Sequence, residues 1–200
     1  NGISLDTTAH RLLIDEWMYS LIGARKNVVR ILGSEDITPH TVAAYLETNL
    51  DKDTLSLWPK TDTGKLQTDV NAFSTMGNVS PIIAPFAEFS KLKTLSSGFG
   101  HKLLQMINPA TGKLHCYFKL QGARSGRMSC SSPNLQQCPH DEKFRSNFIA
   151  EPGTVFVCGD LNQIELRICA ALSKDEAMQN AFRKGLDLHS VTASRMSGKP

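Results

Sequence analysis

The sequence predicts an α+β fold, with a helical first part in residues 1–112 and part of an antiparallel sheet in residues 113–200. Apolar residues at helical spacing dominate the first part, whereas short apolar segments typical of β-strands begin near Lys113. The segment Thr154 to Cys158 has the length and the β-branched content of a strand buried on both faces. A carboxylate, Asp160, follows it after a single glycine.

The longest predicted helix runs from Thr7 to about Leu32, with Asp6 as its N-cap and Gly33 as its stop. Its helix-spaced apolar residues predict a core-facing stripe rather than a cofactor site, and they are Leu12, Leu13, Trp17, Leu21 and Val28. Further helices are expected over residues 41–50, 69–76 and, as one long helix or a broken pair, 81–107.

Two lysines in the last of these helices, Lys91 and Lys93, stand beside small hydroxyl residues. Taken alone, they favour a solvated helix face. The alternative is contact with nucleic-acid phosphates, because lysines and hydroxyls can follow a backbone without reading its sequence.

In the second part, we expect a strand over residues 114–120 and an antiparallel hairpin of strands 144–150 and 154–158. Residues 163–172 predict a helix with one apolar stripe. A capping box that begins at Ser173 predicts the next helix, and Asp187 is expected to cap the last one.

Asp160 has two interpretations. A carboxylate at the mouth of a buried strand is costly unless it meets a cation or the free amides of a helix end. It is therefore either an acidic cap on the helix that follows or a functional acid, and the residue alone does not separate the two.

The bulk composition is that of an ordinary globular protein: 200 residues, 40% hydrophobic and 20% charged, with a net charge of +3. A net charge this small does not by itself indicate a nucleic-acid-binding protein, although it is compatible with a local basic surface. Five cysteines without a C-x-x-C pair favour reduced thiols in an intracellular protein. No apolar run is long enough for a bilayer, so we expect no membrane partner and a cytoplasmic location.

Residues 160–167 read D-L-N-Q-I-E-L-R, which resembles motif A of the family A DNA polymerases, D-Y-S-Q-I-E-L-R, at six of eight positions. The departures are Leu161 and Asn162. Residues 125–139 resemble the family's T-G-R-L-S-S-x-x-P-N-L-Q-N-I-P signature, and residues 187–189 match its D-I-H. The resemblance is looser before Lys113.

This resemblance implies a right-hand polymerase fragment, with a helical thumb in residues 1–112 and the first part of the palm in residues 113–200. It implies template-directed transfer of deoxynucleoside triphosphates to a primer 3′-hydroxyl, with two Mg²⁺ ions, or Mn²⁺ in their place. Asp160 and the backbone carbonyl of Leu161 would bind the metal ions. Glu165 would close the sugar pocket, and Gln163 and His189 would face the triphosphate.

The resemblance also implies contacts with primer–template DNA, which Lys91, Lys93, Arg127, Asn134 and Gln136 would make. Arg and Gln can donate to the minor-groove acceptors that every correct base pair shares. Outside this context, Arg127 would be interpreted as a surface ion pair and Asn134 as a turn cap.

Two further family motifs, B and C, are not found in the chain. Residues 140–142 spell the H-D-E of motif C, but they lack its flanking apolar strands. The chain has no initiator Met and stops without an obvious terminus, so we expect it to be cut from a larger protein. Because motifs B and C are missing, we expect the chain to be inactive alone. The rival hypothesis is a non-catalytic primer–template-binding module, or one half of a split polymerase whose partner supplies the remainder. A bacterial, phage or organellar source stays open.

Overall fold

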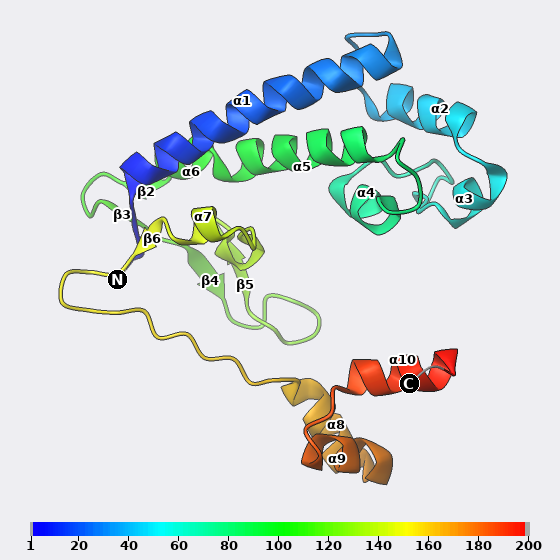
Figure 1. Cartoon of the computed structure of the whole chain (residues 1–200). Coiled ribbons are helices and arrows are strands. Elements are labelled where there is room, and N and C mark those ends of the chain that lie inside the picture. The colour runs from blue at the N-terminus through cyan, green and yellow to red at the C-terminus, as the bar shows by residue number, and fades with distance from the viewer. Residues whose placement is uncertain (1, 199–200) are drawn as a thin grey trace. The chain divides into compact units, whose positions relative to one another are not determined.

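The computed structural model describes residues 2–198 and divides into two compact units, of which the first ends at Thr154 and the second begins at Val155 (Figure 1). The first unit contains β1 Ser4–Leu5, α1 Thr7–Leu32, α2 Pro39–Asn49, α3 Lys52–Leu57, α4 Val70–Met76, α5 Ala84–Phe99, α6 His101–Gln105, β2 Ile107–Asn108, β3 Lys113–Leu114, β4 Tyr117–Lys119, β5 Ser129–Ser131, the 3₁₀ helix η1 Leu135–Gln137, α7 Glu142–Arg145 and β6 Phe148–Ile149. The second unit contains α8 Ile164–Ser173, α9 Glu176–Arg183 and α10 Leu188–Ser197.

The longest helix, α1, has the predicted bounds and the predicted caps. The side chain of Asp6 accepts hydrogen bonds from the backbone N–H groups of Thr8 and Ala9, at 3.0 and 2.9 Å. Gly33 ends the helix in the left-handed region, with φ of 66°, and its N–H donates to the carbonyl of Val29. These local signals explain why both ends of α1 were predictable.

One core of the first unit lies where the far end of α1 meets α2, α4 and α5. Its buried members are Val28, Val42, Leu46, Leu50, Trp58, Leu66, Phe73, Met76, Ile83 and Phe86. The rings of Phe73 and Phe86 stack at 6.3 Å between centroids. Figure 1 shows α5 running beside α1, and these two helices make the largest helix–helix contact of the described residues.

A second core joins the start of α1 to the strands and α7. Its buried members are Leu5, Leu13, Trp17, Leu103, Leu114 and Phe144. The ring of Phe144 stacks on Trp17 and meets Phe99 and Phe148 edge-on. Residues on both sides of position 112 therefore share this core, and the division into thumb and palm at that position stays a prediction.

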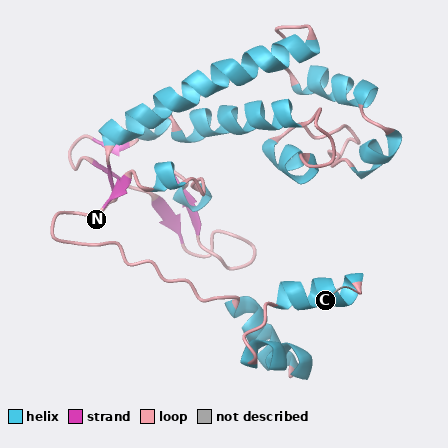
Figure 2. Ribbon diagram, in the orientation of Figure 1, coloured by secondary structure: helices cyan, strands magenta, loops and turns pink. Residues whose placement is uncertain are grey.

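Within residues 2–198, the strands form three two-stranded antiparallel sheets, β1–β6, β2–β3 and β4–β5 (Figure 2). In the first, Ser4 pairs with Ile149 and Leu5 with Phe148. In the third, Phe118 pairs with Cys130. Helices with small antiparallel sheets confirm the predicted α+β class.

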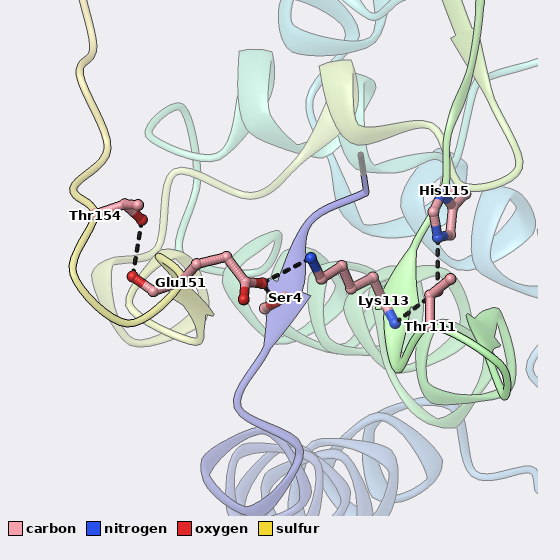
Figure 3. Close-up of polar contacts among 6 residues, drawn as sticks. All are labelled: Ser4, Thr111, Lys113, His115, Glu151 and Thr154. Carbon is pink, nitrogen blue, oxygen red and sulfur yellow. Dashed lines mark hydrogen bonds and ion pairs between the residues drawn. The ribbon is translucent and has the colours of Figure 1, made fainter.

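Polar contacts connect β1, β3 and the turn after β6, as Figure 3 shows. The carboxylate of Glu151 accepts from the hydroxyl of Ser4 at 2.7 Å and pairs with the ammonium of Lys113 at 2.9 Å. These bonds lower the pKa of Glu151, with the Lys113 contact as the main cause. Nearby, the hydroxyl of Thr111 lies 2.7 Å from Nε2 of His115.

The predicted hairpin of residues 144–150 and 154–158 is wrong. Residues 154–160, all of them described, form no strand, and Val155 and Val157 are 80% and 92% exposed. The earlier segment begins as helix α7, because Asp141 caps it by accepting from the N–H of Phe144 at 2.9 Å. Only Phe148–Ile149 is a strand, and its partner is β1, far away in the sequence.

One open alternative is decided, and two smaller predictions need correction. Of the two possibilities for residues 81–107, the structure has the broken pair, α5 and α6, separated at Gly100, where a Cβ would collide with the carbonyl oxygen of Ser96. The strand expected over residues 114–120 is split between β3 and β4. Ser173 does not cap α9; Asp175 does, by accepting from the N–H of Met178.

All five cysteines are free thiols, as predicted. Burial, together with neighbouring Cys130, raises the pKa of the Cys116 thiol to about 11. Over residues 2–198, none of the helices is long and apolar enough to cross a lipid bilayer.

Candidate functional site

The segment of the strongest motif, residues 160–167, passes from exposed extended chain into α8 by a tight turn. Gln163 occupies the left-handed region at φ 51° and ψ 36°, immediately before the helix. The N–H of Ile164 donates to the carbonyl of Leu161 at 3.2 Å, and Nε of Arg167 donates to the carbonyl of Asn162 at 2.9 Å. Two bonds from the helix therefore hold the turn that follows Asp160.

Arg167 is itself held by α9, because its guanidinium lies over the ring of Phe182 at 4.5 Å from the centroid. In turn, Nε2 of Gln179 donates to the carbonyl of Ala170 at 3.0 Å. The helix pair α8–α9 thus forms a support for the turn.

An open pocket in the second unit brings together the predicted catalytic and nucleotide-facing residues. Its lining consists of Asp160, Leu161, Gln163, Ile164, Glu165, Leu166 and His189. Asp160, Leu161, Glu165 and His189 are exposed, and Gln163 is half-buried. Residues from the motif A segment and from the first turn of α10 therefore meet at one concave surface.

Asp187 connects the two sides of this pocket, which the sequence did not predict. Its side chain caps α10 by accepting from the N–H and the hydroxyl of Ser190 at 2.9 and 2.8 Å. It also accepts from Nε2 of Gln163 at 2.7 Å. The bonds from Ser190 and then from Gln163 lower the pKa of Asp187 to about 2, so the carboxylate is ionised at neutral pH.

The donor set around Asp160 fits a divalent cation only in part. The carboxylate of Asp160 and the carbonyl of Leu161 are hard oxygen ligands of the type that Mg²⁺ prefers, although the carbonyl already accepts from Ile164. No group of three or more His, Cys, Asp or Glu residues within the described part of the chain could hold a metal ion.

The H-D-E triplet at residues 140–142 is used structurally. Asp141 caps α7, and Nδ1 of His140 lies 3.0 Å from a guanidinium nitrogen of Arg145. These contacts agree with the interpretation that the triplet is not motif C.

Two predicted DNA-contacting residues, Asn134 and Gln136, stabilise their own loop. Oδ1 of Asn134 accepts from the N–H of Gln136 at 3.1 Å, and Nε2 of Gln136 donates to the carbonyl of Met128 at 3.2 Å. Arg127 is exposed in the loop between β4 and β5, where its carbonyl accepts from the N–H of Ala123 at 3.1 Å. The turn-cap interpretation of Asn134 is thus confirmed, and its contact with DNA stays a prediction.

Lys91 and Lys93 are both exposed on α5. Because positions two apart point to different sides of a helix, the two ammonium groups do not share one face. Nζ of Lys93 lies over the ring of Phe89 at 5.9 Å from the centroid. Any phosphate contacts of the two lysines would therefore be separate contacts.

Comparison with known proteins now decides the family. The family model described as DNA polymerase family A matches residues 16–200. The chain belongs to DNA polymerase family A. Membership agrees with the motif A resemblance at residues 160–167 and confirms the family inferred from it.

Curated relatives of this family A chain include bacterial enzymes named DNA polymerase I. The chain is 37% identical to that of Chloroflexus aurantiacus over 143 residues, which is 70% of this chain and 15% of the relative. It is 34% identical to that of Pseudomonas aeruginosa over 195 residues, or 94% of this chain and 20% of the relative. The chain thus spans about a fifth or less of the length of the relatives it matches.

A solved structure is similar over the whole family A chain. It is the POL domain of Pol1 from M. smegmatis in complex with DNA primer-template and dNTP, with a TM-score of 0.78 and 28% identity. The similarity covers 100% of this chain and 36% of that one.

Proposed function

We propose that the chain is a segment of a DNA-directed DNA polymerase, which transfers deoxynucleotides from their triphosphates to a primer 3′-hydroxyl under the direction of a template. The observation that carries this proposal is the pocket that Asp160, Leu161, Gln163, Glu165 and His189 line together. Family membership and a similar POL domain bound to primer-template and dNTP support it.

Within the pocket, each residue has a role that its chemistry allows. Asp160 and the carbonyl of Leu161 would hold Mg²⁺, with Mn²⁺ as an alternative, beside the triphosphate. Two bound ions would stabilise the attacking and leaving oxygens of an in-line displacement. His189 lies in the first turn of α10, where the helix dipole favours an anion such as a phosphate group, although the amides of His189 and Ser190 already donate to Asp187. Glu165 would close the space beside the sugar.

The first unit would hold the primer–template. In this proposal, residues 1–112 act as the thumb and 113–200 as the first part of the palm. Lys91 and Lys93 would contact backbone phosphates, and Arg127, Asn134 and Gln136 would contact the duplex near the primer end. A cytoplasmic location, in a bacterial or phage-infected cell, stays a prediction.

A second candidate is a primer–template-binding module that does not catalyse alone, or one half of a split polymerase. The observation that favours it concerns the metal ligands: residues 2–198 contain no cluster of three His, Cys, Asp or Glu side chains that could hold a metal ion. Two like-charged divalent ions need more than one carboxylate, so we expect this chain alone to be inactive.

Primer extension separates a polymerase segment, whether in one chain or split, from a binding module. The 200-residue chain should bind primer–template in a salt-dependent manner and extend nothing. Joining or mixing it with a polymerase segment that carries motifs B and C should produce extension. Primer extension by the chain alone would refute the proposal that the active site also needs a segment with motifs B and C. No extension after correct reassembly would favour the binding module.

A further inference from the structure

The carboxylate of Asp187 contacts two of the residues that line the pocket. Its Oδ1 lies 2.7 Å from Nε2 of Gln163 and 3.4 Å from the backbone nitrogen of His189. Its Oδ2 accepts two bonds from Ser190, which begin α10. One side chain therefore joins the turn before α8 to the first turn of α10.

This contact determines how the Gln163 amide is oriented. An ionised carboxylate can only accept, so the amide nitrogen must face Asp187 and the amide oxygen must face away. That oxygen, Oε1, is buried and has no hydrogen-bond partner among the described residues. Because a buried acceptor without a partner is costly, the oxygen of Gln163 is suited to accept from a ligand donor such as a sugar hydroxyl, and not to contact the triphosphate oxygens, which only accept.

The bond to Asp187 also matters because of the backbone conformation of Gln163. Gln163 stands in the left-handed region, which a non-glycine residue adopts at a cost, and its side chain makes no capping bond to α8. The bond to Asp187 is what holds the side chain across the pocket.

We propose that Asp187 is a positioning residue of the nucleotide site, which holds Gln163 and His189 in place for the incoming deoxynucleotide. This inference rests on the proposed function, because that function supplies the ligand. Asp187 itself touches no reacting atom in this proposal; it acts through Gln163 and through the start of α10.

Asp175 provides a matched control. It caps α9 in the same manner as Asp187 caps α10, by accepting from the N–H of Met178 at 2.9 Å. Its capping bond goes to Met178, which does not line the pocket. A role limited to helix capping should therefore make substitutions of Asp175 and Asp187 equivalent.

The experiment uses the complete polymerase that contains this segment, with Asp187→Asn, Gln163→Ala, the double variant and Asp175→Asn. Asn caps helices about as well as Asp, but when its oxygen accepts from Ser190 its amide nitrogen faces Gln163. Gln163 can then keep the contact only by turning its own oxygen toward position 187 and away from the ligand. Asp187→Asn should raise the KM for a deoxynucleotide about tenfold and change kcat less than about twofold. In the Gln163→Ala background the same change should add little, and Asp175→Asn should leave KM unchanged.

Equilibrium binding of a deoxynucleotide to the polymerase on a dideoxy-terminated primer gives a readout independent of turnover. The dissociation constant should follow KM in each variant. Equal effects of Asp187→Asn and Asp175→Asn, or additive effects of Asp187→Asn and Gln163→Ala, would overturn the positioning role. An Asp160→Ala polymerase that incorporates normally would instead refute the proposed function, so the two failures are distinguishable.

Discussion

Asn147 and His10 are joined across 137 residues of sequence, with the amide nitrogen of Asn147 3.2 Å from Nδ1 of the imidazole. The imidazole is fully buried, and its Nε2 lies 2.9 Å from the carbonyl oxygen of Phe99. Since the amide donates to Nδ1, the neutral ring must carry its proton on Nε2 and donate to Phe99. His10 thus connects α1, the end of α5 and the segment before β6.

The first prediction is a pH dependence of stability that His10 controls. Burial lowers the pKa of His10 below its ordinary value of 6.5. The unfolded chain therefore binds the proton first as the pH falls, and folding stability decreases from pH 6.5 downward. Urea unfolding of the chain at several pH values should show this decrease, and His10→Gln should reduce the slope.

His40→Gln is the matched control, because His40 is exposed. It should leave the slope unchanged. An identical slope in the wild-type chain and in His10→Gln would contradict a buried neutral imidazole at this position.

The second prediction concerns Phe144, which the hairpin interpretation placed in a strand. Its ring is fully buried against Trp17, Phe99 and Phe148. Phe144→Ala should therefore lower the free energy of unfolding by about 3–5 kcal/mol. Phe156→Ala, at a residue that is 59% exposed, should change it by less than about 0.5 kcal/mol. Comparable losses in the two variants, measured by denaturant titration, would mean that residues 154–158 are buried after all.

The third prediction is a change in sugar selectivity. If Glu165 closes the space beside the sugar, Glu165→Ala in the complete polymerase should increase ribonucleotide incorporation relative to deoxynucleotide incorporation. Glu176→Ala serves as the control, because Glu176 also lies in the first turn of its helix, α9. The ratio of kcat/KM for the two sugars is the measurement, and an unchanged ratio in Glu165→Ala would remove this residue from the site.

The fourth prediction concerns phosphate contacts by α5. Each of Lys91→Ala and Lys93→Ala should reduce the slope of log affinity for primer–template against log salt by about one. The effects should be separate, because the two side chains point to different sides of the helix. Lys52→Ala, at the exposed start of α3, should leave the slope unchanged. If all three variants behave alike, α5 does not contact the DNA backbone.

Structural features that depend on neighbouring residues in the sequence could be predicted from the sequence. Asp6 and Asp187 each cap the helix that they were expected to cap, because a cap depends on residues within one turn. Likewise, the pocket residues lie within residues 160–166 or at His189, where the motif resemblance placed them.

Contacts between distant segments could not be predicted. The apolar run at residues 154–158 predicted a buried strand, but burial requires a partner strand and covering elements, which the run itself does not encode. Similarly, β6 pairs with β1, and Asp187 binds Gln163 from a different helix. Nothing in the local pattern of either residue indicated that bond.

The central claim is that Asp160 binds metal ions for catalysis rather than capping α8 or holding DNA. The most direct test is Asp160→Ala in the complete polymerase, measured for both single-nucleotide incorporation and primer–template affinity, with Asp141→Ala as the control for a helix-capping acid. We predict that Asp160→Ala abolishes incorporation and leaves affinity nearly unchanged, whereas Asp141→Ala retains incorporation. Near-normal incorporation by Asp160→Ala would contradict the account.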